Sequence, residues 1–206
     1  MIRRRFFIAR AVLRHLRRDR EGVTLVEFAI VGPVLILMLM GLFDIAHTQY
    51  TSAVLYGAVQ KAARDYTLES AGTSSTLIDG RVQDQIRAVM PNGATITFTA
   101  KAFDDFKNVN EREEYTDLNN NGTCNSGEPY EDANNNSVWD VYQGANGIGA
   151  ARDVMLYTTN VTYPRMFPMF GMIGLPANVN LSATTVLRRQ PFDQGSNATP
   201  TVRNCP

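Results

Sequence analysis

A 21-residue apolar segment that contains a single charge constrains this chain more than any other feature. The segment covers residues 23–43, and Glu27 is its only charged residue. As an α-helix it would rise about 30 Å, which is the thickness of the hydrocarbon core of a bilayer. The sequence therefore predicts a membrane-inserted chain with one spanning helix near its N-terminus.

The residues before this span are strongly basic. Residues 1–22 contain eight arginines and only two acidic residues. Because basic residues beside a span are retained on the cytoplasmic side, we expect a cytoplasmic N-terminus and an external domain from Asp44 onward. A cleaved secretory signal peptide has the same order of segments. It fits poorly, because the apolar run is long, contains Glu27 and is followed by no A-x-A-like site.

The start of the span resembles the processing site of type IV prepilin-like proteins. Gly22 ends the basic leader, and Glu27 and Phe28 are the fifth and sixth residues after it. In that family a membrane aspartyl peptidase cuts after the glycine on the cytoplasmic face, which here would make Val23 the first mature residue. The resemblance implies that Glu27 pairs with the N-terminal amine of a neighbouring subunit during assembly. Two charges that are each costly in lipid become tolerable as a pair.

The resemblance narrows to the TadE-like (TadE/TadG) pseudopilins of tight-adherence (Flp/type IVc) pili. It rests on the arginine-rich leader, on residues 20–30, on Gly32-Pro33 ahead of an apolar stretch, and on the C-terminal residues 187–192. The family more often has glutamate where Gln190 stands, and other type IV pilins commonly have phenylalanine where Val23 stands. Neither departure changes the cleavage glycine or the carboxylate.

This resemblance implies a location, a set of partners and a function. Such proteins are single-pass proteins of the bacterial inner membrane, with the head in the periplasm or, within a pilus, outside the cell. Their partners are other pilin or pseudopilin subunits, an inner-membrane assembly platform and the prepilin peptidase. The expected function is that of a minor pseudopilin-like structural component of the pilus or its assembly machinery, which supports surface adhesion.

Composition argues against two broad classes of function. Residues 23–206 hold 12 basic and 18 acidic residues, a formal net charge of −6, and only three of the basic residues are lysines. Without a basic stripe, nucleic-acid binding is not expected. One of the two histidines lies in the leader, and no Ser/His/Asp or Cys/His arrangement is credible. The chain is therefore not expected to be an enzyme.

Hydrophobic periodicity predicts an α+β head on the membrane helix. The helical pattern continues past the span to about Tyr66, and a second, shorter helix follows a Ser/Thr-rich break at residues 70–76. Alternating segments then predict a three-stranded antiparallel sheet from residues 95–102, 153–163 and 178–187. Residues 144–149 are expected to be a flexible return. The predicted organisation is a leader (1–22), a transmembrane helix (23–43) and a head (44–206) that contains a polar insert (104–143) between the first two strands.

The insert contains a calcium-loop pattern. The pattern D-x-[DN]-x-[DN]-G-x5-E is matched by residues 117–128, in which oxygen ligands would come from Asp117, Asn119, Asn121 and Glu128. Oxygens at these positions converge on a hard cation only if the chain turns sharply, which Gly122 permits. The pattern starts again 15 residues later without the glycine, with Asp132, Asn134, Asn136 and Asp140 as candidate ligands.

These two loops resemble the repeated, helix-poor calcium loops of extracellular bacterial and thrombospondin-type modules. Asparagines in place of aspartates lower the charge of each site and predict weak calcium affinity, about 10⁻⁴ to 10⁻³ M. A solvated, asparagine-rich loop that binds nothing is the alternative. If the loops bind calcium and the leader is never cleaved, the chain would instead be a signal-anchored, extracytoplasmic calcium-dependent binding module.

The two cysteines, Cys124 and Cys205, both fall outside the membrane in this topology, where disulfides persist. A bridge between them would tie the C-terminal tail to the insert. It requires that their Cα atoms lie within about 7 Å, which the sequence alone does not show.

Overall fold

The computed structural model describes residues 22–68, 71–125, 127–167, 171, 174, 176–190 and 199–206, without the side chains of residues 71–73. The leader up to residue 21 lies outside this part of the chain. So do Pro191 and Phe192, the last two residues of the C-terminal segment on which the TadE-like resemblance rests. The chain divides into two compact units, one that ends at Ala46 and one that extends from His47 to Pro206.

The first unit contains the N-terminal part of helix α2 (Gly22–Tyr66), which has Pro33 in its interior. This part of the helix is long and apolar enough to cross a membrane, and very little of it is buried inside the protein. Without a bilayer, the leucine, isoleucine and valine side chains of this part would be exposed to water. Soluble proteins rarely expose so large an apolar surface. The helix is therefore compatible with a single-pass membrane anchor.

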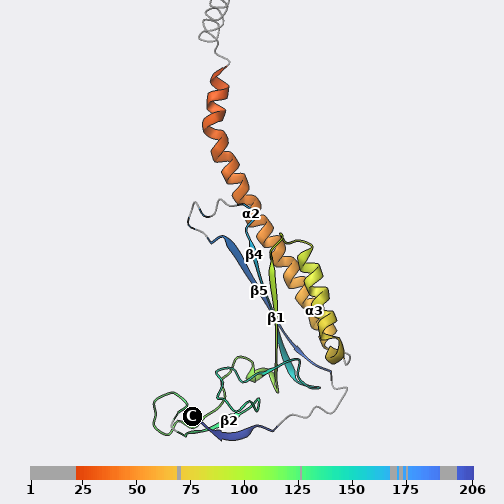
Figure 1. Cartoon of the computed structure of the whole chain (residues 1–206), viewed down its shortest axis with the longest axis vertical. Helices are drawn as coiled ribbons and strands as arrows, with labels where there is room; N and C mark the ends of the chain where they lie inside the picture. Colours follow the sequence, from red (N-terminus) through yellow and green to blue (C-terminus); the bar gives the residue numbers. More distant parts are fainter. Residues whose placement is uncertain are drawn as a thin grey trace, which may run out of the picture. The chain divides into compact units, whose positions relative to one another are not determined.

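The second unit packs two helices against an antiparallel sheet. The last 20 residues of α2 and helix α3 (Ala71–Arg87) run side by side, next to strands β1 (Thr95–Phe103), β4 (Val154–Pro164) and β5 (Asn178–Arg188) (Figure 1). Alternate residues of β4 are buried, as expected for a strand with one covered face. The core joins both helices to β4 and β5 through Leu55, Val59, Tyr66, Ile78, Val82, Ile86, Met155, Tyr157, Val161, Tyr163, Val179 and Leu187.

One partly buried polar contact links three elements of this core. The hydroxyl groups of Tyr66 in α2 and Tyr157 in β4 both donate to Oδ1 of Asp79 in α3, at 2.7 and 2.6 Å. Burial, and then the Asp79 carboxylate, raise the pKa of both tyrosines, so both stay protonated donors at neutral pH. The carboxylate therefore fixes how the two helices sit on the sheet.

The prediction of a three-stranded sheet is wrong by one strand. The sheet has four strands in the order β3-β1-β4-β5, and all its pairs are antiparallel. The additional strand is β3 (Ala145–Asn146), which pairs with Lys101 and Ala102 of β1. It lies in the segment that was predicted to be a flexible return, because a two-residue strand is too short to produce an alternating pattern.

Two further features differ from the sequence-based prediction. Helix α3 begins at Ala71, inside the predicted break at residues 70–76, because serine and threonine oppose a helix only weakly when the rest of it packs on a core. A second sheet pairs β2 (Pro129–Asp132) with β6 (Thr201–Asn204). The polar insert contains a 3-10 helix (Phe106–Asn108) and β2, and β3 follows it ahead of β4.

Candidate functional site

The predicted processing and assembly residues lie at the beginning of helix α2. Gly22 is the first residue of the helix, and Val23, Glu27 and Phe28 follow within two turns, all exposed. The Phe28 ring lies along the next turn, where a Cβ at Gly32 would be 3.3 Å from its Cε1. Among the residues that the structure describes, none pairs with the Glu27 carboxylate. This side chain is therefore available to a partner outside the described chain.

The first predicted calcium loop is a compact turn held by its own side chains. The Asp117 carboxylate accepts from the backbone N–H groups of Asn121 and Gly122, at 3.1 and 2.8 Å. Asn119 Oδ1 accepts from the N–H of Asn121 at 3.0 Å, and Asn121 Oδ1 from the N–H of Thr123 at 2.8 Å. Gly122 has a φ of 75°, in the left-handed region that favours glycine. The side-chain oxygens of the motif are therefore drawn into one tight turn.

The second loop repeats this hydrogen-bond pattern. Asp132 accepts from the N–H groups of Asn136 and Ser137, at 3.0 and 2.8 Å, as Asp117 does in the first loop. Asn134 and Asn136 accept from the residues two positions further on, at 3.0 and 2.7 Å. Ser137 has a φ of 69° and takes the place of the glycine. The near-repeat in the sequence is therefore also a repeat in the structure.

The two loops are closed by buried glutamates, and one of these was missed by the sequence analysis. Glu128 Oε1 accepts from the N–H of Leu118, the residue after Asp117, at 2.9 Å. In the second loop, Glu113 Oε1 accepts from the N–H of Ala133, the residue after Asp132, also at 2.9 Å. Both glutamates are 1% exposed. Glu113 thus occupies in the second loop the place that Glu128 occupies in the first.

Glu113 precedes its loop in the chain, so the spacing of the motif could not identify it. It reaches the loop because the segment that carries it pairs with the segment around β2, through Thr116 N–H to Pro129 O at 2.9 Å and Glu131 N–H to Glu114 O at 2.8 Å. The sequence signal that existed was the density of carboxylates in the insert. That density did not show which carboxylate would be buried.

Asp140, which was predicted to end the second loop, also lies beside it. Its Oδ2 accepts from the side-chain amides of Asn134 and Asn136, at 2.7 and 2.6 Å, and its N–H donates to Glu113 Oε2 at 2.9 Å. Burial raises the pKa of Glu113, and the carboxylates of Asp140 and Asp132 raise it further against two backbone hydrogen bonds that lower it. The surroundings of Glu113 therefore disfavour its charged form relative to an exposed glutamate.

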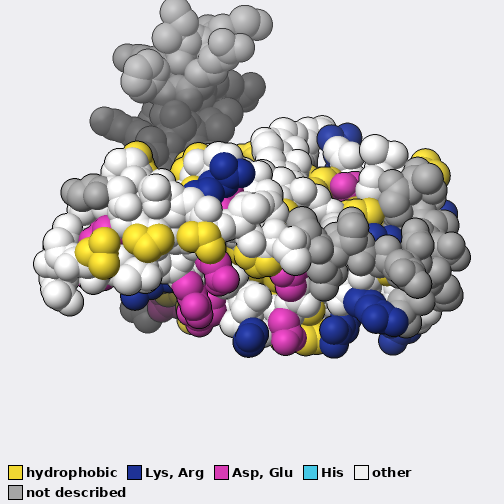
Figure 2. Space-filling view, turned by 90° about the horizontal axis from the view of Figure 1, so that it is seen from below, with side chains coloured by type: hydrophobic (Ala, Val, Ile, Leu, Met, Phe, Trp, Pro, Cys, Tyr) yellow, Lys and Arg dark blue, Asp and Glu magenta, His cyan; other side chains and the backbone are white. Residues whose placement is uncertain are grey.

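The donors in both loops are carboxylate and amide oxygens, which is the ligand class that calcium prefers. Within the described ranges, no group of three or more His, Cys, Asp or Glu side chains is arranged to hold a metal ion. The loops combine carboxylates with asparagine amides, so a calcium shell here would have to use the amide oxygens. Viewed from below, the molecule shows acidic side chains beneath a short row of hydrophobic ones (Figure 2).

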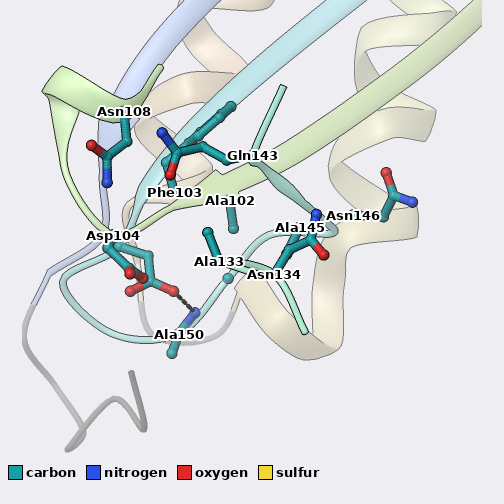
Figure 3. Close-up of a pocket in the computed structure, with 12 residues that line it drawn as sticks. Ala102, Phe103, Asp104, Asn108, Ala133, Asn134, Gln143, Ala145, Asn146 and Ala150 are labelled. Atoms are coloured by element: carbon teal, nitrogen blue, oxygen red, sulfur yellow. Dashed lines mark hydrogen bonds between the residues drawn. The ribbon is translucent and has the colours of Figure 1, made fainter. Parts of the chain in front are cut away.

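A cavity of about 190 Å³ lies beside the second loop. Ala133 and Asn134 of that loop line it together with Ala102 and Phe103 at the end of β1 (Figure 3). Asp153 also lines it, and its Oδ2 accepts from the N–H of Ala150 at 2.7 Å. The second loop and the end of β1 therefore lie on the walls of the same cavity.

The structure joins Cys124 and Cys205 in a disulfide, with their Cα atoms 5.5 Å apart. Cys124 lies within the first loop, and Cys205 directly follows β6. The pairing of β2 with β6 brings the two residues together across 81 residues of sequence.

Comparison with known proteins identifies the N-terminal part of the chain. The family described as TadE-like protein matches residues 22–64. The match begins at Gly22, covers the apolar helix and Glu27, and ends before α3 and the sheet. The TadE-like resemblance is therefore confirmed over residues 22–64, where the chain is similar to this family. No curated protein and no solved structure matches the chain.

Proposed function

We propose that this chain is a minor pseudopilin-like structural component of a tight-adherence pilus or of its assembly machinery. The observation that carries the proposal is the TadE-like match at residues 22–64, which links the chain to this class of pilus. The apolar part of α2 would anchor the subunit in the bacterial inner membrane, with the leader inside and the head in the periplasm. During assembly the same helix would pack with other pilin helices.

In this proposal a prepilin peptidase removes the leader. Gly22 is followed at the fifth position by Glu27, on a helix that is exposed along its apolar length. Cleavage after Gly22 would free the amine of Val23, and that amine would pair with Glu27 of a neighbouring subunit. Because each charge is expensive in hydrocarbon, a pair formed between two subunits would favour assembly.

Intact-mass analysis of the full chain, isolated from the membranes of piliated cells, tests this function. We expect a mature protein that begins at Val23 and lacks residues 1–22. A protein that still begins at Met1 in such cells would contradict the proposal. It would favour the second candidate, an uncleaved, signal-anchored calcium-dependent binding module.

The repeated loops are the observation that favours a calcium-dependent role in either case. The first ion would be held by Asp117, Asn119, Asn121 and Glu128, and the second by Asp132, Asn134, Asn136 and Asp140 together with Glu113. The first loop has two of these carboxylates. The second has three, of which Asp132 is ion-paired with Arg203 at 2.6 Å. Each loop thus carries a net charge of −2 from these groups, which one calcium ion would neutralise.

Calcium is expected to raise the melting temperature of the full chain in detergent. At ten times a dissociation constant of about 10⁻³ M, each site would add about 1.4 kcal/mol to the free energy of unfolding, because the ion binds the folded loops. The double change Asp117→Ala with Glu128→Ala should remove about half of the gain. Differential scanning calorimetry with calcium and with a chelator measures both effects.

A matched control removes the same charge from exposed positions outside the proposed ligand sets. Asp84→Ala with Glu131→Ala changes two exposed carboxylates and should keep the full calcium response. If isothermal titration at millimolar calcium gives no heat and the melting temperature does not move, the loops bind no calcium and the insert is held by its own hydrogen bonds.

A further inference from the structure

The C-terminal segment, residues 201–205, contacts both loops of the insert at once. Toward the first loop, Cys205 is bonded to Cys124, its N–H donates to Glu128 O at 2.8 Å, and its carbonyl accepts from the N–H of Gly127 at 3.1 Å. These contacts involve the loop's own cysteine and the residue that closes the loop. The position of Glu128 is thereby tied to the C-terminus.

The same segment contacts the second loop through two side chains. Arg203 Nε donates to Asp132 Oδ2 at 2.6 Å, and Asp132 is fully buried. The Thr201 hydroxyl donates to Asn135 Oδ1. Asp132 is the first residue of the second loop, and its carboxylate also organises the turn through Asn136 and Ser137. Strand β6 therefore holds the aspartate on which the second turn depends.

Little apolar burial holds this segment in place. Of residues 201–206 only Cys205 is buried, and Val202 is 72% exposed. Strands β2 and β6 pair over four residues each and form a sheet of their own (Figure 1). A two-stranded sheet of this length is marginal in water without further support. Residues 114–116 also pair with β2, whereas β6 is held next to β2 by the disulfide, which reduces the chain entropy that β6 would gain on leaving β2.

We propose that residues 201–205 form a thiol–disulfide-controlled clasp that couples the two loops into one cooperative unit. Closing the clasp oxidises the thiols of Cys124 and Cys205 to one disulfide. The two electrons and two protons pass to the exchanging disulfide of a second molecule, which is reduced to two thiols. When the bond is reduced, β6 leaves β2, Arg203 leaves Asp132, and the second loop loses order although it contains no cysteine. The clasp does not depend on calcium.

Hydrogen exchange of the full chain in detergent, with a chelator present, tests the clasp. Cys124→Ser with Cys205→Ser, or reduction by dithiothreitol, should speed amide exchange at residues 132–140 at least tenfold. Exchange in β4, β5 and α3 should stay unchanged, because the contacts of the clasp with the described residues do not reach these elements. Unchanged exchange at residues 132–140 would overturn the proposal.

A second variant tests the coupling of the loops even if loss of the disulfide unfolds the whole head. Arg203→Met keeps the disulfide and removes only the ion pair with Asp132, so exchange should rise at residues 132–138 and, through β6, also at residues 117–125. Arg81→Met is the matched control, since it removes the ion pair between exposed Arg81 and half-buried Asp65 at 3.5 Å. It should affect neither loop. If Arg203→Met changes the second loop alone, the loops are not coupled and the proposal fails.

Discussion

Replacement of Gly22 by leucine is expected to abolish removal of the leader, so that the membrane-bound protein retains residues 1–22. Gly22 is the small residue that ends the basic segment, and it immediately precedes the proposed cleavage point. No atom of the described residues lies within 4 Å of a Cβ placed at Gly22, and leucine favours a helix more than glycine does. The variant should therefore fold and insert normally.

The measurement is the intact mass of the variant beside that of the unaltered chain, both isolated from the same piliated cells. Gly57→Leu provides a control in the same helix, because Gly57 is also exposed and a Cβ at this position would have no atom within 4 Å. It should be processed as usual. Cleavage of the Gly22→Leu chain before Val23 would show that the glycine is not what the peptidase recognises.

The long strands of the main sheet could be predicted because their two faces differ. Along β4 and β5, buried and exposed residues alternate over 11 residues each, so apolar and polar side chains alternate in the sequence as well. Strand β3 has two residues, and its pairing with Lys101 and Ala102 depends on the path of the insert. No local pattern contains that information.

The loops show where motif spacing is sufficient and where it is not. The first loop takes all its predicted oxygens from 12 consecutive residues, so a pattern could identify it. The second loop is contacted by Glu113, which precedes it in the sequence, and by Arg203 of β6, which lies near the end of the head sequence. Both contacts depend on strand pairing over long sequence separations. The composition of the insert indicated its charge but not these partners.

The second large effect is expected at Glu27. Replacement by valine should leave membrane insertion intact, or improve it, while incorporation into the pilus or its machinery falls at least tenfold. A carboxylate in hydrocarbon costs about 2.5–3.5 kcal/mol, and none of the described residues offsets this cost. If the N-terminal amine of another subunit offsets this cost only on assembly, the Glu27→Val chain loses that stabilisation. The loss exceeds the 1.4 kcal/mol that corresponds to a factor of ten in an equilibrium constant.

The measurement compares the amount of the chain in sheared surface fibres and assembly complexes with the amount in the membrane. Glu27→Asp keeps the carboxylate on the same exposed side of α2 and should retain a substantial part of the incorporation, whereas Glu27→Val should not. Because valine lowers helix stability by only a few tenths of a kcal/mol relative to glutamate, helix loss cannot account for a tenfold defect. Normal incorporation of Glu27→Val would show that the carboxylate has no partner in the assembly and is tolerated near the end of the span by reaching the membrane surface.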